Sequence, residues 1–283
     1  MILWENHYSN RLSGDVQLND LYKRRDMVEL MHVVGRDHRT TIGLFQKVDT
    51  MQNDGVRMLD RFKKANADDP YVLYAEQLQL TRQGDHQGAL AVAERMMQLD
   101  STYAEAVIAR AGSLSALGRH TEAIAGFERA FAMDTVLVGM HYSIGLCKFR
   151  MKDYAGAITS MEKYIAREKK QKEAYDVLGA SYYYQKRFSE AVKSYSEYIK
   201  LDPKSPNGWL NRASVHLQSN NTDLALADYD VVLKRDPSNR QAMFNKATAL
   251  VRKGRKAEGC EILQQMAAKG DPAAAQQLRG LCK

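Results

Sequence analysis

The sequence predicts an all-α fold built from a repeated pair of helices. Apolar residues recur three or four positions apart, as along one face of a helix, and do not alternate as in a strand. Only five prolines interrupt the 283 residues. The chain also resembles itself at a period of 34 residues, which is long enough for a helix, a tight turn and a second helix.

Residues 172–205 show this unit most clearly. The first helix carries an apolar stripe at Tyr175, Leu178, Gly179 and Tyr182, and the second at Ala191, Tyr195 and Tyr198. Lys186 lies in the turn between them, and Asp202-Pro203 closes the unit because proline resists helix continuation.

Six registers of this unit follow one another, and they begin at Pro70, Ala104, Val138, Lys172, Pro206 and Arg240. The eighth place is small except for Gln77, reading Gln77, Ala111, Gly145, Gly179, Ala213 and Ala247. The twentieth place is small throughout, reading Ala89, Ala123, Ala157, Ala191, Ala225 and Gly259. The twenty-fourth place is mostly large, reading Ala93, Phe127, Met161, Tyr195, Tyr229 and Leu263. Small residues are required where paired helices approach closely, since overpacking such a contact costs about 1–3 kcal/mol.

These small and large places resemble the tetratricopeptide repeat (TPR) family. Tyr175 and Trp209 match the aromatic place of its first helix, and Leu178-Gly179 and Ile144-Gly145 match its Leu-Gly pair. The resemblance implies a right-handed α-solenoid with repeats at 70–103, 104–137, 138–171, 172–205, 206–239 and 240–273. In the third repeat residues 167–170 replace the closing Asp-Pro, so we expect that helix to run longer or kink differently.

The two ends are expected to be helical caps. Residues 1–35 are interpreted as an N-terminal helical extension or cap, and residues 36–69 as a degenerate repeat. At the other end, Gly270 ends a helix, Asp271 caps the next one and Pro272 suits its first turn, which predicts a capping helix within 271–283. A solenoid needs such caps because its terminal units otherwise expose an apolar face.

Composition and charge narrow the class of protein. No apolar run approaches the ~18 residues of a membrane span. The first residues lack a secretion signal, so the chain is cytoplasmic if Met1 is the native start, and exported or periplasmic if a leader has been removed. It could equally be a fragment of a longer array. Three cysteines give neither an even-numbered disulfide framework nor metal-ligand spacing, and we expect Cys147 and Cys260 to be structural.

The sequence offers no catalytic constellation. Seven histidines are scattered without HExxH spacing, and there is neither a phosphate-cradling GxxxxGK nor a GxSxG elbow. His86 and His120 stand one period apart at the aromatic turn place, which favours packing over metal binding. We therefore expect a non-enzyme with no cofactor and no metal.

The remaining candidate for a functional site is a binding surface, which is placed here by family resemblance alone. In TPR proteins the first helices line a concave groove. Carried over, its residues are Tyr71, Tyr74 and Arg82, then Tyr142, Phe149, Arg150, Asp176, Tyr183, Tyr184, Asn207, Asn211, Gln218, Phe244, Asn245 and Arg252. Aromatic residues and arginine are the types that interfaces prefer.

The expected function is a scaffold or adaptor that holds an extended peptide or helix of another protein in this groove. A chaperone carboxylate clamp is rejected, because of its five places, read at Asp176, Ala180, Asn211, Gln241 and Asn245, only Asn211 matches. Two alternatives stay open: a nucleic-acid-associated repeat centred on the basic residues 234–256, and the regulatory region of a longer protein. Most of the net charge of +7 lies in residues 206–283.

Overall fold

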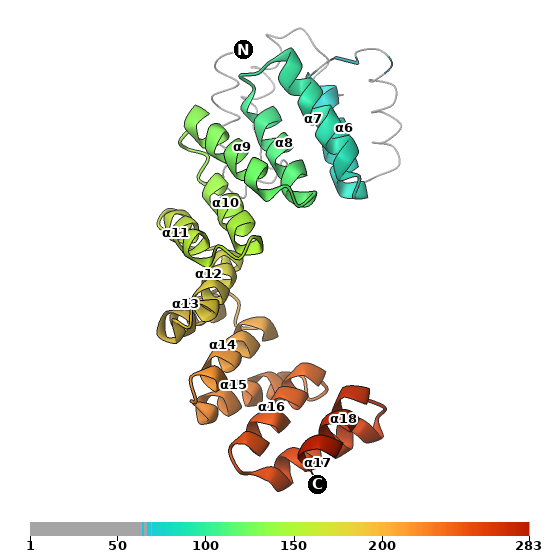
Figure 1. Ribbon diagram of the computed structural model, residues 1–283, viewed down its shortest axis with the longest axis vertical. Helices are drawn as coiled ribbons and strands as arrows, with labels where there is room; N and C mark the ends of the chain where they lie inside the picture. The colour runs from blue at the N-terminus through green and yellow to red at the C-terminus, as the bar shows by residue number, and fades with distance from the viewer. Residues whose placement is uncertain (1–63, 65–66, 69, 283) are drawn as a thin grey trace, which may run out of the picture. The chain divides into compact units, whose positions relative to one another are not determined.

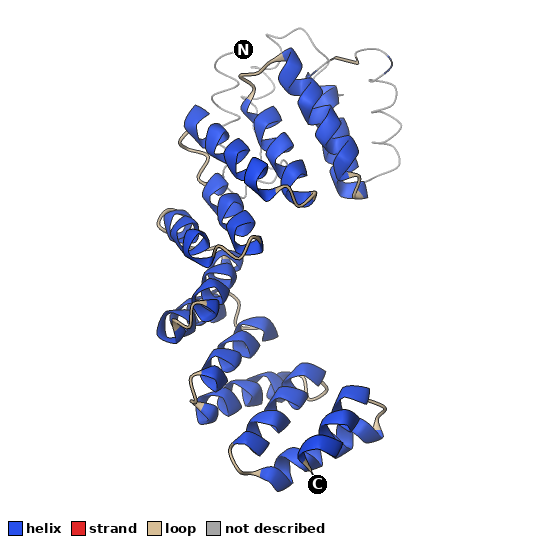
Figure 2. Cartoon of the chain, viewed as in Figure 1, coloured by secondary structure: helices blue, strands red, loops and turns tan. Residues whose placement is uncertain are grey.

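The computed structural model describes residue 64, residues 67–68 and residues 70–282, and every regular element in that part of the chain is a helix (Figure 2). The extension expected over residues 1–35 lies outside the described residues. So does the degenerate repeat expected over residues 36–69, apart from those three positions.

The described helices form two compact units, here called unit 1 and unit 2, with the boundary after Asp153. Unit 1 contains α6 (Pro70–Gln83), α7 (His86–Leu99), α8 (Ala104–Ala116), α9 (His120–Met133) and α10 (Gly139–Arg150). Unit 2 contains α11 (Tyr154–Ile165), α12 (Lys172–Tyr184), α13 (Phe188–Leu201), α14 (Pro206–Gln218), α15 (Thr222–Arg235), α16 (Arg240–Arg252), α17 (Lys256–Ala268) and α18 (Pro272–Leu281). Within each unit every helix packs against the next along the chain, so the helices stack in sequence order (Figure 1). The all-α helical-repeat solenoid predicted from the sequence is confirmed.

The small and large places pack as the steric argument requires. All six residues of the twenty-fourth place are buried, from Ala93 to Leu263. The small places leave no room for a larger residue. A Cβ at Gly179, in the eighth place, would lie 2.9 Å from Cζ of Tyr195. A Cβ at Gly259, in the twentieth place, would lie 2.6 Å from the carbonyl oxygen of Ala247. Gln77, the exception at the eighth place, is buried and donates from Nε2 to Oγ1 of Thr81 at 3.0 Å.

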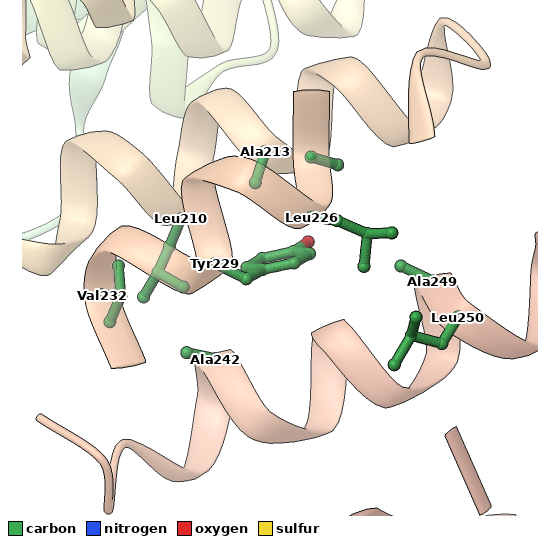
Figure 3. Packing of buried hydrophobic residues seen from close by; sticks show 9 residues of the cluster. Leu210, Ala213, Leu226, Tyr229, Val232, Ala242, Ala249 and Leu250 are labelled. Carbon is green, nitrogen blue, oxygen red and sulfur yellow. The ribbon is translucent and has the colours of Figure 1, made fainter. Parts of the chain in front are cut away.

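The core between α14, α15 and α16 shows this packing closely. Figure 3 shows the Tyr229 ring lying between Leu210 and Leu226, with Ala242 below it. Tyr229 is 1% exposed. Such close packing makes the core sensitive to changes in side-chain volume.

Every intrarepeat turn in the described residues reverses through a residue of positive φ. Gly84, Gly118 and Gly254 have φ of 79°, 78° and 87°, and the matching turn places Lys152, Lys186 and Asn220 have φ of 62°, 60° and 60°. In the turn at Lys186, the backbone amide of Lys186 donates to the carbonyl oxygen of Tyr183, and that of Arg187 donates to the carbonyl oxygen of Tyr182. This pattern closes the C-terminus of a helix and needs a left-handed residue whatever its identity.

One expectation about the third repeat was wrong. The helix before residues 167–170 does not run longer: α11 ends at Ile165, and a turn follows. The turn is held because the Tyr164 hydroxyl donates to the side-chain oxygen of Gln171 beyond it.

The C-terminal helix α18 begins as expected. Gly270 has φ of +86°, and the Asp271 carboxylate accepts hydrogen bonds from the amides of Ala273 and Ala274 at 3.0 and 3.1 Å. Ala274 is buried against α17, and Leu278 packs on the same apolar cluster. None of the described helices has the length and apolar character needed to cross a membrane.

Candidate functional site

The first helices α12, α14 and α16 of unit 2 carry nine of the fifteen residues expected to line a groove. Tyr184, Asn207, Gln218 and Arg252 are exposed, and Asp176, Tyr183, Asn211, Phe244 and Asn245 are half-buried. All nine therefore reach the surface. The other six lie in unit 1, and Tyr142, Phe149 and Arg150 among them are on α10.

The earlier positions of unit 1 give a mixed result. Tyr74 packs against the buried cluster of Leu73, Met96 and Ala106, so it belongs to the core more than to a groove. Arg82 is exposed in the last turn of α6. The side chain of Tyr71 lies outside the described part of the chain.

Two predicted residues from neighbouring repeats meet directly. Asn211 on α14 donates from Nδ2 to Oδ1 of Asp176 on α12 at 2.9 Å. Burial raises the pKa of Asp176, the bond from Asn211 opposes this rise, and the nearby Glu173 adds to it. The Asp176 carboxylate is thus a partly desolvated acceptor whose position is held by the next repeat.

The two tyrosines at the end of α12 belong to an aromatic cluster, here defined as Tyr154, Tyr183, Tyr184 and Phe188. Tyr184 stacks on Tyr154 with ring centroids 4.7 Å apart and meets Tyr183 edge-on at 5.6 Å. Tyr183 in turn lies 6.2 Å from Phe188. Tyr184 nevertheless remains 56% exposed. The cluster therefore presents aromatic surface to solvent while its rings support one another.

Sequence reasoning did not connect Tyr154 and Phe188 with this surface. The available signal was the aromatic turn place, since Tyr154 and Phe188 occupy it in successive repeats, next to the ends of first helices.

Asn245 and Arg252 on α16 keep their polar groups available. Neither side chain makes a hydrogen bond or ion pair within the described residues, and Arg252 is exposed. Burial raises the pKa of Tyr229 to about 12, and the nearby Arg252 opposes this rise. A donor amide and a cation thus accompany the Asp176–Asn211 pair on the first helices of unit 2.

The histidines in the described part of the chain are not grouped as metal ligands. His86 and His120 begin α7 and α9, are half-buried, and each keeps a buried Nδ1 without a hydrogen-bond partner, as does the buried His216. In the described part of the chain no three His, Cys, Asp or Glu side chains are grouped so that they could hold a metal ion.

The cysteines differ from expectation. Cys260 on α17 and Cys282 after α18 form a disulfide, with Cα atoms 5.7 Å apart. The sequence had shown no framework because the bond depends on α18 folding back onto α17, which spacing alone does not reveal. Cys147 is a buried free thiol, consistent with a structural role.

Four of the eight cations in the basic stretch of residues 234–256 pair with carboxylates. Arg240 pairs with Asp271, Lys246 with Asp230, Lys253 with Asp223 and Arg255 with Glu258. Three of these pairs join different helices, and the pair of Arg255 with Glu258 lies at the start of α17.

Comparison with known proteins agrees with this architecture. A family model for the tetratricopeptide repeat matches residues 142–206, 176–239 and 210–275. No curated protein sequence matches the chain.

Several solved structures share the fold at low sequence identity. The C-terminal part of a TPR repeat-containing protein from Cytophaga hutchinsonii is 19% identical, with a TM-score of 0.69, and the alignment covers 85% of this chain and 98% of that one. YrrB, described as a TPR protein with an unusual peptide-binding site, is 18% identical over 66% of this chain and 97% of its own, with a TM-score of 0.55. A fragment of MamA from Desulfovibrio magneticus is 16% identical over 60% and 97%, with a TM-score of 0.57.

At these identities the solved structures show the fold alone. The family model, which matches across residues 142–275, identifies the helical repeats of that stretch as tetratricopeptide repeats, in agreement with the paired-helix architecture of the described residues.

Proposed function

We propose that this protein is a non-catalytic protein–protein interaction scaffold, and that unit 2 binds an extended peptide or helix of a partner along α12, α14 and α16. TPR folds generally serve as interaction scaffolds, and the structurally similar YrrB is described as having a peptide-binding site. Rigid stacking of the helices favours such binding, because a pre-formed surface leaves most of the ordering entropy to the partner.

The observation that carries this proposal is the hydrogen bond between Asp176 and Asn211. It uses one N–H of Asn211 and leaves the second N–H and the carbonyl oxygen without a partner in the described residues. Those two groups match the C=O and N–H of a peptide backbone. Asn245, one period later, offers a complete amide at the equivalent place.

Side chains around these amides supply contact area and charge. Tyr183 and Tyr184 provide aromatic surface at low entropic cost, and Arg252 provides a cation. Asp176 provides a carboxylate. The proposed face therefore suits a peptide that carries both an apolar side chain and charged groups. Tyr142, Phe149 and Arg150 are proposed to offer a similar surface on unit 1 by itself.

The test is selection of peptides from a random displayed library against the whole chain. A second selection uses the variant in which Tyr183, Tyr184 and Asn211 are all changed to Ala. Sequences enriched only by the unaltered chain are expected, because the variant loses the aromatic surface and the backbone amide. Equal enrichment of the same peptides by both proteins would show that the face is wrongly assigned.

A control variant, Leu224→Ala with Gln264→Ala, changes exposed residues on the second helices α15 and α17. It is expected to enrich the same peptides as the unaltered chain.

A further inference from the structure

The corner between the start of α14 and the end of α15 is filled by Trp209. Its Nε1 donates to the carbonyl oxygen of Pro203 at 3.1 Å. The guanidinium groups of Arg212 and Arg235 lie over its ring, 5.1 and 5.6 Å from the centroid. The indole thus lies at this corner with two cations over its ring.

One period later, at the start of α16 and the end of α17, the equivalent corner is open. Met243 stands where Trp209 stands in the preceding repeat, and Lys269 stands in the place of Arg235. A pocket of about 370 Å³ occupies this corner, with Met243 and Met266 in its lining. Its size is at the lower end of the ~300–1,000 Å³ typical of ligand pockets.

The charges at the pocket are unequally engaged. Asp271 is fully committed, since it accepts from the amides of Ala273 and Ala274 and pairs with Arg240. Lys269, which also lines the pocket, is exposed and makes no ion pair with any described residue. The cation left to meet a ligand is therefore Lys269, next to a thioether-lined recess.

We propose that this pocket binds an aromatic side chain of a partner protein, and that an acidic residue beside that side chain pairs with Lys269. The preceding repeat shows that this corner of the fold accepts an indole ring with cations beside it. Methionine side chains adapt to such rings and make favourable sulfur–aromatic contacts. The site shares no residue with the face proposed above on α12, α14 and α16, so it is a second point of attachment.

The test uses three blocked peptides as probes: Glu-Trp-Glu, Glu-Ala-Glu and Lys-Trp-Lys, all acetylated and amidated. Binding is followed by NMR of the whole chain labelled at its methionine methyl groups, with Met243 and Met266 assigned by substitution. Glu-Trp-Glu is expected to shift both methyl signals with a Kd of about 0.1–1 mM, since a single anchoring side chain gives weak binding. The peptides lacking the ring or carrying the opposite charge are expected to bind at least about threefold more weakly.

The decisive variant is Met243→Trp, which places in the pocket the side chain that the preceding repeat carries. It should abolish the Glu-Trp-Glu shift at Met266, whereas Met151→Trp, at an exposed position in unit 1, should leave the shift unchanged. Equal binding by the Met243→Trp variant, or no shift with Glu-Trp-Glu in the unaltered chain, overturns the proposal.

Two further measurements cover the remaining outcomes. If Met243→Trp loses helical content, Lys269→Glu decides instead: it should reverse the order of the acidic and basic peptides, and an unchanged order overturns the proposal. If the methyl signals shift with protein concentration alone, a second copy of the chain occupies the pocket and the proposed partner is wrong. The Tyr183, Tyr184 and Asn211 variant should bind Glu-Trp-Glu normally, which separates this site from the proposed peptide-binding face.

Discussion

Arg212 on α14 donates two hydrogen bonds to the carboxylate of Asp228 on α15, from Nε at 2.9 Å and from Nη2 at 2.7 Å. Its Nη1 also donates to Oγ of Ser196 on α13 at 3.0 Å. Asp228 is only 4% exposed. One arginine therefore ties three successive helices together and satisfies a buried carboxylate.

Changing Arg212 to Ala is expected to lower the free energy of unfolding by about 2–4 kcal/mol, because it leaves Asp228 buried without its cation. Chemical denaturation followed by circular dichroism measures the loss. Arg119→Ala is the matched control: it removes an exposed pair with Glu122 and should change little. A comparable effect of the two substitutions would contradict the burial argument.

Substitution of a turn residue with positive φ is predicted to raise the stability of the chain instead of lowering it. Lys186→Gly is expected to stabilise the chain by about 0.5–1 kcal/mol, since a lysine at φ of 60° is strained and glycine is not. Asn220→Gly should give less, because asparagine tolerates this conformation better. Gly118→Ala should destabilise the chain for the same reason. Thermal unfolding of the three variants would disprove the reasoning if Lys186→Gly were the least stable.

His216 predicts a dependence of stability on pH. Burial lowers the pKa of His216, Asp228 opposes that shift, and Arg212 adds to it. The unfolded chain therefore binds this proton at a higher pH than the folded chain, so stability is lost as pH falls below about 6.5 and levels off below the folded pKa. Denaturation midpoints of the His216→Gln variant should lack this decline between neutral and mildly acidic pH. Parallel pH profiles for the two proteins would refute the assignment.

The disulfide predicts a local rather than global effect. Cys260 and Cys282 are 22 residues apart, and a crosslink closing such a loop contributes about 2–4 kcal/mol. Cys282→Ser should therefore speed amide hydrogen exchange in α18 and the end of α17, while α12 stays protected, because repeat proteins can open from their ends. Chemical reduction of the unaltered chain should reproduce this pattern. Unchanged exchange in α18 would mean that the bond adds no stability there.

The repeat register could be predicted because it follows from steric demand. A residue larger than Gly179 would collide with Tyr195, and small residues recur at this place every 34 residues except at Gln77. Capping of α18 by Asp271 was likewise predictable, since it depends on residues adjacent in sequence. Local chemistry and strict periodicity are visible in a sequence.

Contacts that depend on side-chain placement between helices were not predictable. Stacking of Tyr154 on Tyr184 joins two different places of successive repeats, and no periodic rule pairs them. The Cys260–Cys282 bond needs the return of α18 onto α17. The turn residues Lys152 and Lys186 adopt positive φ although the sequence marks that conformation only where glycine stands.

The partly buried carboxylate of Asp176 is predicted to lower the stability of the folded chain at neutral pH. Burial raises the pKa of this carboxyl, so the folded chain binds its proton more tightly than the unfolded chain, and stability falls as pH rises through the folded pKa. Asp176→Asn retains an acceptor for Asn211 and should raise the unfolding temperature at pH 7, with a smaller gain at pH 3. A lower unfolding temperature at pH 7 would show that the charged form is needed for folding.

The central claim is tested most directly by isothermal titration of a selected peptide into the unaltered chain and into the variant with Tyr183, Tyr184 and Asn211 changed to Ala. Loss of interface anchors predicts at least a tenfold weaker Kd for the variant, since each anchor contributes about 1 kcal/mol or more. The Leu224→Ala, Gln264→Ala control should keep the original Kd. An unchanged Kd in a variant with native helical content would contradict peptide binding along α12, α14 and α16.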